Sequence, residues 1–152
     1  MRVAVQHRLC SFDPMSPGQT SFAHIQYEIC RLSALLYSDL VLFPIPDHSS
    51  IKPSLLYELG RILDKLESEI EAAGTVLPHT GRELLAWCVM LGAAASTSDA
   101  VFRDQYRKRL EHCIGHDARL RDWDYYKALV RRYLWWGYLL DSVAGEAFNG
   151  IS

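Results

Sequence analysis

The chain has 152 residues, of which 49% are hydrophobic, and its 16 Lys and Arg against 18 Asp and Glu give a formal net charge of -2. This length predicts a single domain, and the hydrophobic content excludes an intrinsically disordered chain. The balanced charge argues against direct contact with nucleic acid, and the longest apolar run, residues 84–95, is shorter than the roughly 20 residues that a membrane span needs.

Residues 1–19 contain turn-forming residues and no sustained hydrophobic period, which predicts a leader or flexible segment. A first helix then begins at Thr20 or Ser21, either of which can act as its N-cap. Its apolar residues recur at three- and four-residue steps and are Phe22, Ile25, Ile29, Leu32, Leu36 and Leu40. Pro44 disfavours helical geometry in the residue before it and therefore ends this helix.

A second helix is predicted after a loop at residues 47–50, with Pro53 in its first turn and Gly74 as its left-handed terminator. Its apolar stripe consists of Leu55, Leu56, Leu59, Ile62, Leu63, Leu66 and Ile70. Gly60 costs this helix up to about 1 kcal/mol relative to Ala. Either another backbone comes close at Gly60, or the helix tolerates the glycine.

A third helix is expected at the centre of the fold. Thr80 followed by Glu83 matches a capping box at its start. Residues 82–96 are then apolar on nearly all faces, as in a helix that other helices surround. The small residues at its end, from Gly92 onwards, permit a neighbouring helix to pack closely.

The last third of the chain predicts two more helices and a tail. Ser98 or Asp99 opens a fourth helix, and Gly115 closes it. Its expected inward residues are Val101, Phe102, Tyr106, Leu110 and Cys113. A fifth helix starts at Asp122 or in the preceding loop, continues through Trp136, breaks near Gly137 and resumes toward Leu140. Residues 142–152 then form a frayed tail or a cut edge.

These elements predict an all-α fold, because no strand-like alternation of useful length is present. We expect a single helical domain of about five to six helices around the central apolar helix at residues 82–96. The division of the chain is a leader at 1–19, a helical regulatory-type domain at 20–145 and a tail at 146–152.

Three stretches carry a resemblance to a known family. They are the segment at residues 29–44, which leads to a proline, the apolar helix with a Trp at 82–95, and Trp123 followed by the aromatic segment 130–140 with Asp141-Ser142. In this order and at this spacing they resemble the fungal-specific transcription factor domain, the helical regulatory region of fungal zinc binuclear cluster regulators. The chain has no six-cysteine cluster of the kind that binds DNA in that family.

The resemblance implies a non-enzymatic regulatory domain in transcription regulation, located in the nucleus and associated with secondary metabolism. Such a domain would sense an apolar small-molecule effector or a protein partner, which can be a second copy of the chain. The effector or partner would shift a conformational equilibrium of the domain only as far as its affinities for the two states differ. We expect the chain to be part of a longer regulator or a stand-alone relative that contacts neither DNA nor membrane.

Two other functions stay open. A stand-alone cytoplasmic protein on the same scaffold could be a cofactor-free cyclase or isomerase that orients an apolar secondary metabolite by proximity. Alternatively, the chain is the helical partner of another subunit and uses an exposed Trp face. A fold hosts chemistry only through a specific site. The sequence specifies no such set of catalytic residues, which makes the catalyst the weaker interpretation.

The candidate proton-transfer groups of the catalyst are Asp39 and Asp141, which both lie among apolar residues. An unpaired carboxylate is costly to bury, so two interpretations are open. The two side chains line a polar point in a cavity and move protons. Otherwise each faces solvent, caps a helix or pairs with an arginine such as Arg31 or Arg131.

A dense aromatic cluster supplies the candidate ligand-binding residues. Four positions are selected, namely Tyr37, Trp87, Tyr133 and Trp136. Three interpretations of these side chains are open. They pack in the core, they form a surface for a protein partner, or they line a pocket for an apolar ligand. Trp135 and Trp136 are adjacent and cannot both face one way on a helix, so one of them should meet a cavity, a partner or solvent.

No metal or other cofactor is expected. His112 and His116 have the four-residue spacing of helical metal ligands, but Gly115 is expected to end the helix between them. The four cysteines are Cys10, Cys30, Cys88 and Cys113. No two of them lie within four residues of each other, which excludes zinc-ribbon spacing and predicts reduced, buried thiols.

Overall fold

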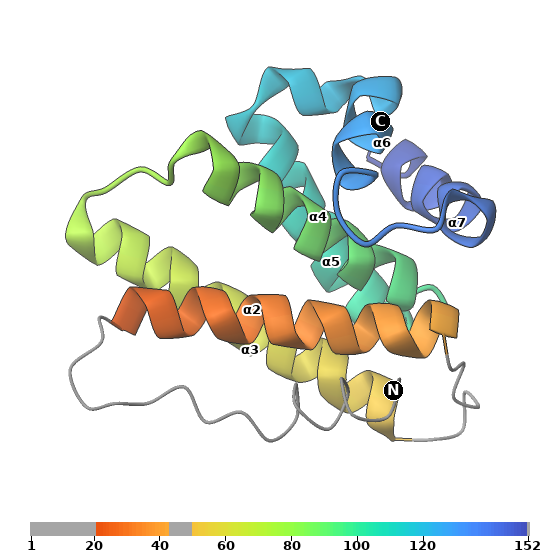
Figure 1. The fold of residues 1–152 in the computed structure, drawn as a ribbon, viewed down its shortest axis with the longest axis horizontal. Coiled ribbons are helices and arrows are strands. Elements are labelled where there is room, and N and C mark those ends of the chain that lie inside the picture. The colour runs from red at the N-terminus through yellow and green to blue at the C-terminus, as the bar shows by residue number, and fades with distance from the viewer. Residues whose placement is uncertain (1–20, 43–49, 152) are drawn as a thin grey trace.

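The computed structural model describes residues 21–42 and 50–151, which form helices and turns without any strand (Figure 1). This confirms the prediction of an all-α, single-domain fold. The predicted leader, Pro44 and most of the predicted loop at 47–50 lie outside the described residues. No helix in the described ranges is long and apolar enough to cross a membrane.

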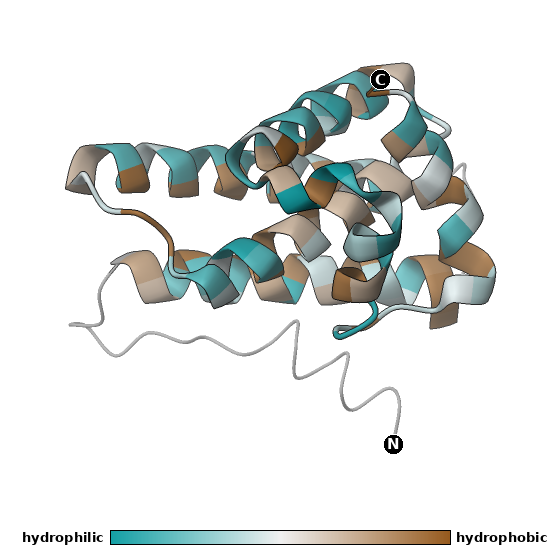
Figure 2. Cartoon of the chain, turned by 90° about the horizontal axis from the view of Figure 1, so that it is seen from above, coloured by the Kyte–Doolittle hydropathy of each residue, from teal (hydrophilic) through white to brown (hydrophobic). Residues whose placement is uncertain are grey.

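The first two long helices form an antiparallel pair (Figure 1). Helix α2 (Ser21–Tyr37) continues directly into a π-helical turn, η1 (Ser38–Leu42), and packs along α3 (Ile51–Ala73). Hydrophobic and hydrophilic residues alternate along the turns of the long helices in Figure 2, as amphipathic helices require. Gly74 ends α3 with a positive φ of 59°, which confirms the predicted terminator.

Helix α4 (His79–Ala95) is the centre of the fold. Every residue from Ala86 to Ala95 is buried, and the helix contacts α2 and α3 as well as the three helices that follow it. This confirms the prediction of a central apolar helix. The predicted capping box is wrong, because Pro78 is the N-cap residue and no side chain caps the helix. Glu83 instead accepts a hydrogen bond from Arg132 at 2.8 Å.

Helix α5 (Ala100–His116) begins where the sequence predicts. Asp99 is the N-cap, and its carboxylate accepts hydrogen bonds from the backbone N–H groups of Val101 and Phe102. Two expectations for this helix are wrong. Val101 is exposed rather than inward, and the helix continues past Gly115 to His116.

The C-terminal part differs most from the prediction. A short 3-10 helix, η2 (Ala118–Arg121), precedes α6 (Trp123–Val130), which ends six residues earlier than expected. Residues 131–136 form a connection, and α7 (Gly137–Asn149) covers most of the expected tail. The tail prediction is therefore wrong for residues 142–149, where Phe148 packs against the rings of Trp123 and Tyr126.

Two buried tyrosines tie helices together through their hydroxyl groups. Tyr106 of α5 donates to the carbonyl oxygen of Leu56 at 2.9 Å, and Tyr126 of α6 donates to that of Ala86 at 2.8 Å. The three cysteines in the described residues are free thiols. Of these three, Cys88 is fully buried. The two tyrosine hydrogen bonds join α5 to α3 and α6 to α4 within the core.

Candidate functional site

The connection at residues 131–136 is fixed to the central helix. Trp87, a predicted ligand-binding residue, is buried in α4 and stacks on the ring of Tyr133, with centroids 5.6 Å apart and planes 25° apart. Its Nε1–H donates to the carbonyl oxygen of Leu134 at 3.0 Å. The structure thus brings two of the four predicted ligand residues together, in contact with each other.

The same connection is also fixed to α7. The indole Nε1–H of Trp135 donates to Oδ1 of Asp141 at 2.8 Å, and the guanidinium of Arg131 donates to Oδ2 of the same carboxylate. Asp141 therefore lies in a charge-assisted network with Arg131, which is one of the two interpretations that the sequence left open. Through these two hydrogen bonds the Asp141 carboxylate holds the connection against α7.

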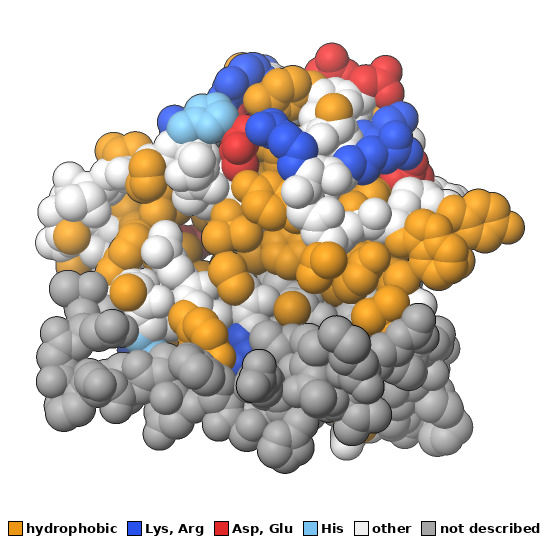
Figure 3. All heavy atoms as spheres, viewed as in Figure 1, with side chains coloured by type: hydrophobic (Ala, Val, Ile, Leu, Met, Phe, Trp, Pro, Cys, Tyr) orange, Lys and Arg blue, Asp and Glu red, His pale blue; other side chains and the backbone are white. Residues whose placement is uncertain are grey.

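An exposed apolar surface results from this arrangement. Trp136 is 47% exposed and Tyr138 is 88% exposed, and their ring centroids lie 6.3 Å apart. Leu134 and Leu139 are exposed beside them in the chain. These four residues form what we call the aromatic surface. Figure 3 shows hydrophobic side chains gathered on the face of the molecule that carries α4, α6 and α7.

Trp135 and Trp136 divide as their adjacency in the sequence requires. Trp135 is half-buried against the core and donates its N–H inward, whereas Trp136 lies outside and meets solvent. The sequence could predict this division but not which of the two faces outward. That choice depends on Asp141, which lies in the next helix.

The remaining predicted site residues lie on other elements. Tyr37 is the last residue of α2, where burial raises the pKa of its phenol. Asp39 is buried in η1, and its Oδ2 lies 3.9 Å from Nζ of Lys52 on α3. Asp39 and Asp141 therefore each face a cation of their own, on different elements. Periodicity gave no signal for the π-helical turn that buries Asp39.

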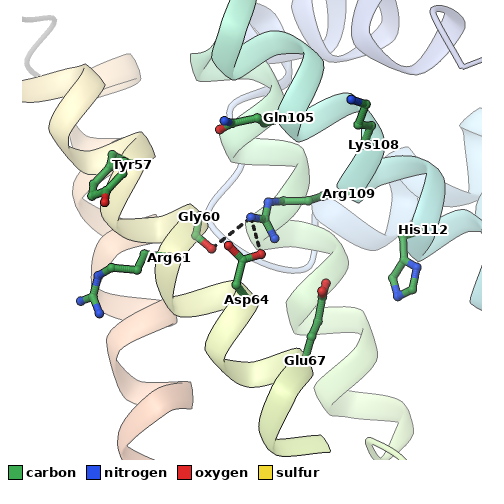
Figure 4. A pocket seen from close by; sticks show the side chains of 9 residues that line it. All are labelled: Tyr57, Gly60, Arg61, Asp64, Glu67, Gln105, Lys108, Arg109 and His112. Atoms are coloured by element: carbon green, nitrogen blue, oxygen red, sulfur yellow. Dashed lines mark hydrogen bonds and ion pairs between the residues drawn. The ribbon is translucent and has the colours of Figure 1, made fainter. Parts of the chain in front are cut away.

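A groove with a volume of about 500 Å³ lies between α3 and α5, and most of its lining side chains are polar or charged (Figure 4). Arg109 crosses it from α5, donating to the carbonyl oxygen of Gly60 at 3.1 Å and to Oδ1 of Asp64 at 2.7 Å. The lining residues are Tyr57, Gly60, Arg61, Asp64, Glu67, Gln105, Lys108, Arg109 and His112. None of the predicted ligand residues lines this groove.

Gly60 lines the groove, but its lack of a side chain is not required there. A Cβ there would lie 3.6 Å from NH2 of Arg109 and 4.0 Å from the Tyr106 hydroxyl, which are ordinary contact distances. No second backbone approaches it that closely, so α3 tolerates the glycine, the second of the two alternatives for this position. Among the lining residues, Arg109 and Asp64 form an ion pair. Arg61 pairs with Glu58 of α3, and Lys108 pairs with Asp104 of α5.

Comparisons with protein-family models, curated proteins and solved structures give no match to this chain. The resemblance to the fungal-specific transcription factor domain therefore stays a prediction. In the described residues no group of three or more His, Cys, Asp or Glu side chains is arranged to hold a metal ion. The aromatic surface is the feature of the described chain whose composition best matches a known kind of binding site.

Proposed function

We propose that this chain is a non-enzymatic helical regulatory domain that binds a protein partner through the aromatic surface. The observation that carries the proposal is the exposure of Trp136 and Tyr138 side by side. Trp and Tyr dominate the binding energy of protein interfaces because they bury a large area at a low cost in side-chain entropy. Large exposed apolar residues that lie together are typical of interaction sites.

The way in which the surface is held supports the same proposal. Trp87 fixes Leu134, and Asp141 fixes Trp135 and Arg131, so the segment between them is anchored on both sides. A partner would therefore bind a surface that is already ordered, and ordering costs would subtract little from the binding energy. The resemblance in sequence supports a role in transcription regulation and a nuclear location for this domain.

A protein partner accounts for the surface better than an apolar small molecule does. Trp87 and Tyr133 stack on each other, and Trp136 lies on the outside rather than in a hollow. We propose no catalytic role, because no observation favours the alternative of a cyclase or isomerase. Its two candidate carboxylates, Asp39 and Asp141, are held by Lys52 and Arg131.

The proposal is tested by fusing the full chain to a heterologous DNA-binding module and measuring reporter transcription in fungal cells. We expect the fusion to change transcription several-fold relative to the module alone, and the variant W136S/Y138S to abolish that change. Trp136 is the N-cap residue of α7 and makes no capping hydrogen bond. Because Ser is a favoured N-cap, the substitution there removes the aromatic ring without weakening the helix.

The matched control is Val76→Ser, which removes another exposed hydrophobic side chain, 82% exposed, from the connection between α3 and α4. This variant should keep the full transcriptional effect. Circular dichroism should give the same helicity for all three proteins. A fusion with no effect on transcription, or an effect that W136S/Y138S retains, would contradict the proposal.

A further inference from the structure

Two histidines lie one turn apart at the end of α5. His112 and His116 are both exposed, and their Nε2 atoms are 3.0 Å from each other. The rings meet edge to face, with centroids 4.3 Å apart and planes 77° apart. This arrangement exists because α5 continues through Gly115, where the sequence had predicted that the helix would end.

The distance between the two nitrogen atoms matches that of two ligands on one metal ion. Histidine nitrogen atoms bind Zn²⁺ at about 2.0–2.1 Å, so two of them at a right angle lie roughly 2.9 Å apart, and at the tetrahedral angle roughly 3.4 Å apart. The observed 3.0 Å lies within this range. An i, i+4 pair of histidines on one helix face is also the spacing that zinc enzymes use.

The electrostatic surroundings favour a cation at this place. The C-terminal end of a helix carries the negative end of its dipole, and His116 is the last residue of α5. Glu67 of α3 lines the same groove as His112, so a carboxylate lies on the groove side of the pair. The arginines beside the pair are neutralised by carboxylates, Arg109 by Asp64 and Arg119 by Asp117.

We propose that His112 and His116 chelate a divalent transition-metal ion, and that they bind Cu²⁺ more tightly than Zn²⁺, as the general order of affinities for nitrogen ligands requires. No third His, Cys, Asp or Glu in the described ranges completes the site. The other coordination positions therefore carry water or a donor atom of an added ligand. The site is independent of the aromatic surface, and its failure leaves the proposed function untouched.

Isothermal titration of the full chain with Cu²⁺ and with Zn²⁺, in a buffer that does not bind metals, tests the proposal. We expect one ion per chain at this site. His112→Asn and His116→Asn should each weaken binding at least about 10-fold, because losing either ligand abolishes the chelate effect. The double variant should bind the metal ion no more weakly than either single variant does. His79→Asn, which removes another exposed histidine, should leave the affinity unchanged.

A second measurement does not depend on affinity. Zn²⁺ should raise the midpoint of thermal unfolding of the wild-type chain, since an ion that binds only the native helix stabilises it. The same addition should leave the midpoint of either single variant unchanged. Losses that are additive in the double variant would show separate histidines rather than a chelate and would overturn the proposal, as would a thermal shift that either single variant retains.

Discussion

Gly92 lies on the buried side of α4, directly against the ring of Tyr106. A Cβ atom at this position would be 2.0 Å from Cε1 and 2.4 Å from Cδ1 of that ring. Tyr106 cannot move aside easily, because it is buried and its hydroxyl donates to the carbonyl oxygen of Leu56 on α3. The missing side chain of one residue therefore permits α4 and α5 to approach each other closely.

Gly92→Ala is consequently expected to destabilise the protein by about 1–3 kcal/mol, the usual cost of overpacking a core. Gly115→Ala is the matched control, because it adds the same methyl group to α5 where no atom lies within 4 Å. The control should gain up to about 1 kcal/mol from better helix propensity. Urea denaturation followed by circular dichroism measures both, and a Gly92→Ala variant as stable as the wild type would refute this account.

At the scale of helices, the sequence predicts ends that depend on neighbouring residues and misses those that depend on distant ones. Asp99 and Gly74 cap their helices through backbone groups two to four residues away, so the local pattern is sufficient. Thr80 and Glu83 match a capping box equally well in sequence. Glu83, however, pairs with Arg132, which only the tertiary fold brings to it.

This difference predicts opposite results at two helix starts. Asp99→Ala should reduce the free energy of unfolding by about 1 kcal/mol, because two backbone N–H groups of α5 lose their acceptor. Thr80→Ala should change it by less than about 0.5 kcal/mol, since Thr80 lies within α4 and caps nothing. Urea denaturation of both variants decides the matter. If Thr80→Ala reduced the free energy of unfolding as much as Asp99→Ala does, Thr80 would act as a helix cap and this account would be contradicted.

At the scale of the whole molecule, hydrophobic periodicity predicts the core and the fold class, but not the site. Residues 82–96 are apolar on nearly all faces, so the sequence places this helix at the centre of the other helices. The candidate site depends on contacts between segments far apart in sequence. Trp87 donates to Leu134, 47 residues away, and α6 ends at Val130 where helical periodicity continued. No local pattern contains these contacts.

The same packing should make the free energy of unfolding decrease at alkaline pH. Burial raises the pKa of the Cys113 thiol from 9.0 to about 12, and it raises the pKa of the Cys88 thiol and of the Tyr126 phenol as well. In the unfolded chain these groups ionise at lower pH than in the folded protein. The free energy of unfolding is therefore complete below about pH 9 and falls as the pH rises towards 12.

Each such group lowers the free energy of unfolding by about 1.4 kcal/mol per pH unit between its unfolded and folded pKa values. Urea denaturation at intervals from pH 8 to pH 11 should show this decline, and Cys113→Ala should make it shallower by the share of one thiol. The slope is the informative quantity, because the substitution also changes stability at neutral pH. A free energy of unfolding that stays constant across this range would mean that these thiols and phenols are not held in a solvent-excluded core, and the packing around α4 would then be wrong.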